Sequence, residues 1–233
     1  MGLRNVAVSV LWLGVISCAL RAEVVGAKIE NVRMESPRAA VVRVSNNSGK
    51  EITGVSLSVD LGYKNGKQTH FDQSLDLLPE LIQEQSDDIL RDAAFLAGQS
   101  REITITGYED IAAVNVTVNM VAYLDRTYEG DTAAIERMTT ARKDWADTLQ
   151  EGAAIIAAAA TDHATPHPVR VVLRQLKDLY DKASGTRQMT LKAMMQDVRN
   201  MQLQKATTEE LKTYGLHKGR AAAVAFDHIK GAN

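Results

Sequence analysis

The chain has a single cysteine, Cys18, which lies at the end of an apolar N-terminal stretch. Aromatic residues make up only 5% of its 233 residues, and Pro occurs 4 times. If the stretch with Cys18 is removed, the remaining chain can form no disulfide, thiol nucleophile or cysteine metal site. Its core must therefore be mainly aliphatic, and a chain of this length can bury one without cross-links.

The N-terminal stretch has the three parts of a secretory signal. Arg4 supplies a positive charge, residues 6–16 are mostly apolar, and small residues follow. The run is too short to span a bilayer as a stable helix, so we expect residues 1–22 to be a signal peptide, cut after residue 17, 19 or 22. Residues 15–18 also match a relaxed lipobox, in which Cys18 becomes lipidated. We therefore expect an exported protein, periplasmic or extracellular, either soluble or lipid-anchored through Cys18, with no transmembrane span in the mature chain.

Residues 54–61 carry a clear strand pattern. Val55, Leu57, Val59 and Leu61 alternate with small or polar residues, which predicts one buried face and one solvent-exposed face. Residues 39–45, 101–106 and 114–124 alternate similarly, and in the last of these the pattern puts Val116, Met120 and Ala122 on one face. These strands and the turns between them predict an immunoglobulin-like β-sandwich over residues 23–129, with a small barrel as the alternative.

Two features interrupt this pattern. Asn65 and Gly66 predict a hairpin with a type I′ turn, because that turn needs positive φ at both positions. Residues 75–95 mix apolar and acidic residues without alternation, and we interpret them as an acidic insertion with some helix.

Part of the sandwich segment resembles a known family. The residues that carry the resemblance are Val44, Asn46, Ser48, Gly49, Ile52, Val55 and Leu57, followed later by Gly98, Gln99 and Ser100. In them the segment resembles the FxLYD type of bacterial immunoglobulin-like domain. The naming motif keeps Leu61, whereas Val59, Gly62 and Tyr63 replace its other residues. The resemblance implies an exported, non-catalytic module and supplies no catalytic residues.

Residues 130–233 have helical periodicity, so the predicted fold class is α+β. Asp131 is a predicted N-cap, and apolar residues spaced by three or four continue to Ala160, with Arg142 on the same stripe. Prolines at 166 and 168 end this helix. A second helix is expected over 169–183 with Gly185 as its end, a third over 191–201, and a fourth from the capping box of Thr207 and Glu210, resuming at 221–229. Short loops predict an α-helical hairpin or small bundle.

Charge is divided unevenly along the chain. Residues 23–165 hold 13 Lys and Arg and 23 Asp and Glu, a net charge of 13 − 23 = −10. Residues 166–233 hold 12 and 6, or +6. This basic end either docks on the acidic part, is simply solvated, or meets an anionic surface. We expect a protein partner or self-association through the C-terminal helices, and no nucleic-acid partner.

Three groups of residues suggest other roles by their type or spacing. Asp162, His163 and His167 are metal-ligand types close in sequence, but no fourth ligand has a suitable spacing. Tyr214 and Lys218 match the spacing of short-chain dehydrogenases without the Gly-rich turn that a cofactor needs. Met189, Met194, Met195 and Met201 favour a helix core over an adaptable partner surface. We therefore assign no catalytic residue, cofactor or metal ligand.

Two hypotheses for function follow. The first is an exported, non-catalytic envelope protein, in which the β-sandwich binds or scaffolds and the helical tail mediates interaction. The alternative is an envelope enzyme or metal-binding protein with a site at the seam between sandwich and helices. An enzyme should have a concave pocket there with converging titratable groups, whereas a scaffold should expose an apolar stripe or groove.

Overall fold

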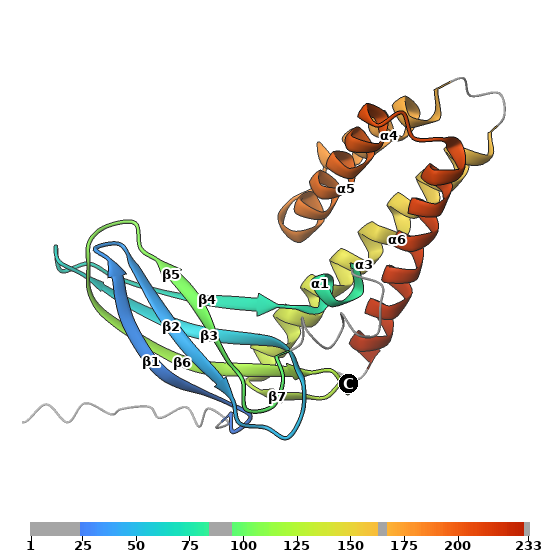
Figure 1. Ribbon diagram of the computed structural model, residues 1–233. Helices are drawn as coiled ribbons and strands as arrows, with labels where there is room; N and C mark the ends of the chain where they lie inside the picture. The colour runs from blue at the N-terminus through green and yellow to red at the C-terminus, as the bar shows by residue number, and fades with distance from the viewer. Residues whose placement is uncertain (1–23, 84–94, 163–166, 231–233) are drawn as a thin grey trace, which may run out of the picture.

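The computed structural model describes residues 24–83, 95–162 and 167–230. An antiparallel β-sandwich forms the N-terminal part and helices form the rest, which confirms the predicted α+β class (Figure 1). The elements are β1 (Ala27–Ser36), β2 (Ala39–Asn46), β3 (Ile52–Tyr63), β4 (Gln68–Asp76), α1 (Leu78–Gln83), β5 (Ser100–Thr106), β6 (Ile111–Tyr123), β7 (Tyr128–Gly130), α3 (Thr132–Thr161), α4 (Pro168–Tyr180), α5 (Gly185–Leu203) and α6 (Thr208–Ile229). The predicted signal peptide, Cys18 and most of the acidic insertion lie outside the described residues.

The sandwich has one sheet of three strands, in the order β1-β2-β5, and one of four, in the order β4-β3-β6-β7. The chain turns back between β3 and β4 as Asn65 and Gly66 predict, but the type I′ turn was wrong. Of the two residues Asn65 and Gly66, only Gly66 has positive φ, at 83°. The Gly66 N–H donates to the Tyr63 carbonyl, and the Tyr63 N–H donates to the Lys67 carbonyl. This is the three-residue loop with a glycine bulge, which needs positive φ at one position only.

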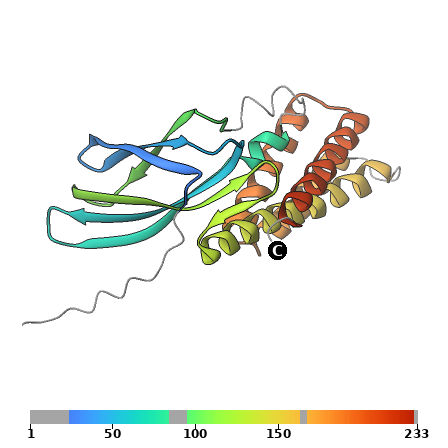
Figure 2. The same cartoon turned by 90° about the horizontal axis from the view of Figure 1, so that it is seen from below.

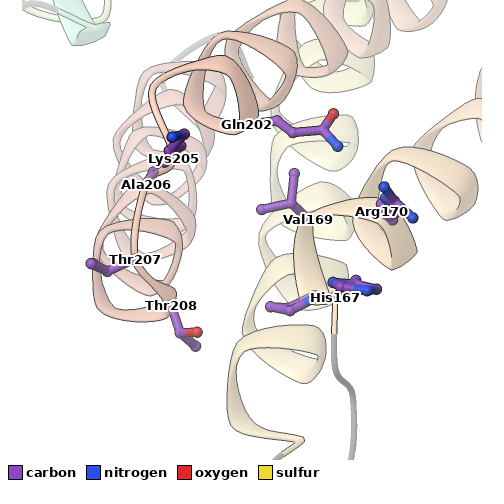
Figure 3. A pocket seen from close by; sticks show the side chains of 9 residues that line it. His167, Val169, Arg170, Gln202, Lys205, Ala206, Thr207 and Thr208 are labelled. Carbon is purple, nitrogen blue, oxygen red and sulfur yellow. The ribbon is translucent and has the colours of Figure 1, made fainter.

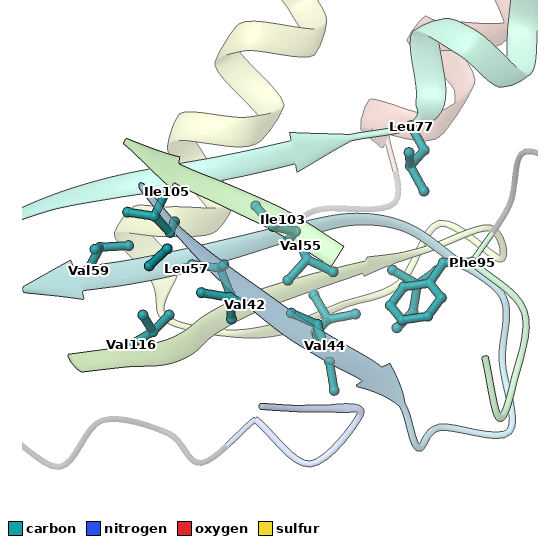
Figure 4. Close-up of a cluster of buried hydrophobic side chains, with 14 of the residues drawn as sticks. Val42, Val44, Val55, Leu57, Val59, Leu77, Phe95, Ile103, Ile105 and Val116 are labelled. Atoms are coloured by element: carbon teal, nitrogen blue, oxygen red, sulfur yellow. The ribbon is translucent and has the colours of Figure 1, made fainter. Parts of the chain in front are cut away.

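The core of the sandwich lies between the two sheets. Leu57 and Val59 of β3 are fully buried there and face Val42 of β2 and Ile105 of β5 (Figure 4). Each of these residues alternates with a neighbour that points the other way, so the predicted inner face of residues 54–61 is confirmed.

The other face of β3 is not solvent-exposed as expected. Thr53, Ser56 and Ser58 are all at least nine-tenths buried. The N-terminal half of α3 packs on this outer face, where Met120 and Ala122 form a small apolar cluster with Ala134 and Met138. The sequence pattern of β3 shows small polar residues here, because a helix can approach the sheet closely only over small side chains.

A bulge in β6 explains a second wrong expectation. Met120 pairs with Ser56 but Val118 pairs with Leu57, so Asn119 is an extra residue in the ladder. An extra residue reverses the alternation beyond it. Val116 therefore belongs to the sandwich core, whereas Met120 and Ala122 face α3 instead of sharing its face.

The helical region follows the predicted order with two corrections. Asp131 caps α3 through Ala134, and Thr207 and Glu210 form the predicted capping box. However, α4 ends at Tyr180, and Gly185, with φ of 56°, begins α5 instead of ending α4. The fourth helix, α6, is also continuous instead of resuming at 221.

The four helices share one apolar core, as the hairpin or bundle prediction expected. α3 and α6 run side by side away from the sandwich, and α4 and α5 form a hairpin beside them (Figures 1 and 2). Met194 and Met195 are in this core and Met201 is partly buried, but Met189 is 67% exposed, so the core interpretation was wrong for Met189. In the described ranges, every helix is too short or too polar to cross a membrane.

Candidate functional site

The seam between sandwich and helices is centred on Arg142 of α3, whose side chain is 1% exposed. Its guanidinium donates to the carboxylate of Asp76 on β4 at 2.8 and 3.0 Å. It also donates to Thr53 of β3 at 3.2 Å and to the hydroxyl of Tyr128 on β7 at 3.1 Å. Burial is the largest single influence on the pKa of Arg142 and lowers it, but the charges and hydrogen bonds of Asp76 and Tyr128 together raise the pKa above its ordinary value.

The last turn of α6 closes the other side of the seam. The Tyr128 hydroxyl donates to the backbone carbonyl of His228 at 3.1 Å, so one chain of hydrogen bonds links α3, β7 and α6. The His228 side chain is buried, and its Nδ1 has no hydrogen-bond partner among the described residues. Burial, together with the positive charges of Arg142 and Arg126, lowers the pKa of His228 below its ordinary value.

The described contacts of Arg142 join the helices to the sandwich. The polar groups at the centre bond to one another, whereas catalysis needs titratable groups that converge on an open cavity. Arg142 lies on the predicted helix stripe, but its partners come from strands more than sixty residues earlier or from β7. Sequence reasoning missed this network. The available signal was a single arginine on an otherwise apolar helix face, which requires a buried partner.

The candidate metal ligands are not brought together in the described structure. His163 lies outside the described residues, Asp162 caps the end of α3, and His167 is exposed at the start of α4. Among the residues that the structure describes, no group of three His, Cys, Asp or Glu side chains could hold a metal ion.

Tyr214 and Lys218 do lie together, but both contact Asp197 of α5. The Tyr214 hydroxyl donates to this carboxylate at 2.8 Å, and the Lys218 ammonium lies 3.5 Å from it and 4.9 Å from the Tyr214 ring centre. Burial and then the charge of Asp197 raise the pKa of Tyr214. The pair therefore links α6 to α5, and a phenol held protonated in this way is a poor proton acceptor.

A pocket of about 350 Å³ lies at the end of the helical region that is far from the sandwich. It lies between the start of α4 and the loop from α5 to α6 (Figures 1 and 3). Gln202 and Val169 extend into the gap between these segments, and His167, Arg170 and Lys205 stand at its rim (Figure 3). Its described lining contains no acidic residue, so the pocket adds to the basic character of the helical end.

Comparison with known proteins gives little guidance. No protein-family model matches the chain, and no curated protein matches it. A solved structure from Peptoclostridium difficile 630, described as a hypothetical protein, aligns with 51% of this chain and 92% of its own, at 11% identity and a TM-score of 0.31. A likeness this distant carries no argument about fold or function.

Proposed function

We propose that the chain is an exported, non-catalytic envelope protein, a binding or scaffolding module whose helices mediate interaction. The observation that carries this proposal is the seam. Where the enzyme hypothesis places a site, Arg142 bonds to Asp76 and Tyr128, and these contacts hold the helices on the sandwich. A rigid joint of this kind suits a protein that presents one part to a partner while the other part positions it.

Charge supports an interaction role for the helices. The sequence leaves open whether the basic end docks on the acidic part; in the described residues Arg187 pairs with Glu151 across the two, and most other Lys and Arg side chains of the basic end are exposed. Most of the basic charge is therefore directed to solvent. Export rests on the N-terminal pattern of residues 1–22, and the resemblance to FxLYD-type domains agrees with an exported module.

One observation favours the alternative, an enzyme or metal-binding protein with a site at the seam. Nδ1 of His228 has no hydrogen-bond partner among the described residues and could accept a proton or bind a cation. The positive charges of Arg142 and Arg126 lower the pKa of His228, and they would also repel a cation bound to it. The alternative is therefore the weaker candidate.

The test is capture from solubilised membranes with the exported chain as bait, beside a matched bait with R174Q, K192Q and R199Q. Partners retained by the first bait and lost by the second would support the helical interaction role. Equal capture by both would contradict it. Metal binding that H228Q abolishes would favour the alternative.

A further inference from the structure

The outer face of α5 has an unusual composition. Its residues Met189, Lys192, Gln196, Arg199 and Leu203 are all exposed and recur at steps of three and four. They therefore form one stripe along the helix, on the side opposite the buried Leu191, Met194 and Val198. Met189 and Leu203 form the apolar ends of this stripe, and the cations Lys192 and Arg199 lie between them.

The neighbouring helix α4 also carries exposed cations. Arg170, Arg174 and Lys177 are exposed and share the side of α4 opposite the buried Val172 and Leu176. Both helices thus direct cations away from the bundle core.

These cations are largely uncompensated. Residues 167–206 hold 8 Lys and Arg and 3 Asp and Glu, a net charge of 8 − 3 = +5. Two of the acids are engaged, Asp181 with Lys177 and Asp197 with Lys218. In the described part of the chain, Arg170, Arg174, Lys192 and Arg199 form no ion pair. Elsewhere the exposed helix cations are paired more often, as Lys143 is with Asp147.

The two apolar side chains decide between possible partners. Met189 is 67% and Leu203 is 81% exposed, and both stand on the same stripe as Lys192 and Arg199. The surface is a convex helix face without an aromatic side chain, whereas protein hot spots favour aromatic anchors. Isolated apolar side chains among cations suit the headgroup layer of a bilayer, where the cations meet phosphates and the apolar groups enter the acyl boundary.

We propose that the outer face of the α4 and α5 hairpin binds the surface of an anionic phospholipid bilayer. This inference rests on the proposed interaction role of the helices and names their partner. Each Lys or Arg near an anionic bilayer strengthens binding roughly fivefold, so the four cations that form no ion pair with a described residue suffice for weak, salt-sensitive binding.

The test is vesicle flotation of the exported full chain. Every protein carries C18S, so that no acyl chain on that residue can contribute. The vesicles are pure phosphatidylcholine, or equal parts of phosphatidylcholine and phosphatidylglycerol, at low and high salt. The variant is R174Q/K192Q/R199Q, and the matched control is K28Q/R33Q/K212Q, which removes as many exposed cations from β1 and α6.

We expect the parent to float with anionic vesicles at low salt and to dissociate at high salt. The hairpin variant should bind at least tenfold more weakly, and the control should bind like the parent. L203S should weaken binding without changing its dependence on salt. Equal binding to neutral vesicles, or equal losses in variant and control, would overturn the proposal. Absence of vesicle binding while membrane proteins are still captured would reject the lipid partner and leave the proposed function standing.

Discussion

Arg142 and Asp76 form a buried ion pair that joins the long helix α3 to strand β4 of the sandwich. The Arg142 guanidinium donates two hydrogen bonds to one carboxylate and one each to Thr53 and Tyr128. A second pair, Arg137 with Asp72, joins the same two elements nearer the start of α3, but the Arg137 side chain is 53% exposed. The two pairs therefore form a natural comparison of buried and exposed electrostatics in one interface.

R142M should destabilise the protein by about 3 to 5 kcal/mol, because it leaves the partly buried Asp76 carboxylate without its cation. R137M should cost less than about 1 kcal/mol, because exposed ion pairs contribute little. Urea unfolding of both variants measures the difference. Equal costs would mean that the seam does not depend on the Arg142 network.

Protonation of His228 should weaken the protein at acidic pH. Because its pKa is lowered in the folded state, the unfolded state binds more protons below about pH 6.5. Stability should therefore fall as pH drops from 7.5 toward 5.5, and H228Q should reduce that fall. Urea midpoints across this range measure it, with H70Q, at an exposed site on β4, as the control. The same pH dependence in H228Q and the parent would contradict the burial of a neutral imidazole.

Two glycines of α6 should respond oppositely to alanine. A Cβ at Gly215 would lie 2.8 Å from a methyl of the buried Ile156, so G215A should cost about 1 to 3 kcal/mol through overpacking. At Gly219 the nearest contact would be an ordinary 3.7 Å to Ala153, so G219A should stabilise by up to about 1 kcal/mol through helix propensity. Thermal melts of both variants decide this, and destabilisation by both would show that α6 packs more closely than described.

The bulge at Asn119 predicts which residues of β6 are coupled to the helix. M120A and M138A should each destabilise by about 2 to 4 kcal/mol, and a double-mutant cycle should show coupling of more than about 0.5 kcal/mol because the two lie in one cluster. V116A should cost a similar amount but add independently to M138A, since Val116 lies on the other face of the sheet. Coupling of Val116 to Met138, without coupling of Met120 to Met138, would mean that the bulge is misplaced.

Local patterns predicted the elements well. The alternation of Leu57 and Val59 identified the sandwich core, and Asp131 and Thr207 identified where α3 and α6 begin. These features depend on residues close together in sequence, so they can be predicted from one amino-acid sequence.

The wrong expectations concern features that are determined by contacts between segments distant in sequence. The alternation around Asn119 continues without interruption in sequence, and only pairing with β3 reveals the extra residue. Likewise, the sequence predicted a helix that resumes at residue 221, whereas α6 is continuous and packs along α3. The partners of Arg142 could not be predicted because they come from other elements, and the exposure of Met189 depends on which side of α5 faces the bundle.

Site-specific photo-crosslinking in intact cells tests the interaction role of the helices most directly. A photoreactive residue replaces exposed Gln196 on the outer stripe of α5, and the control positions are Thr104 on β5 and Thr213 on α6, which are also exposed. The account predicts that position 196 gives a lipid or protein adduct in the envelope fraction and that both controls give little. Adducts from Thr104 alone, or none in the envelope fraction from any position, would contradict an envelope protein that acts through its helices.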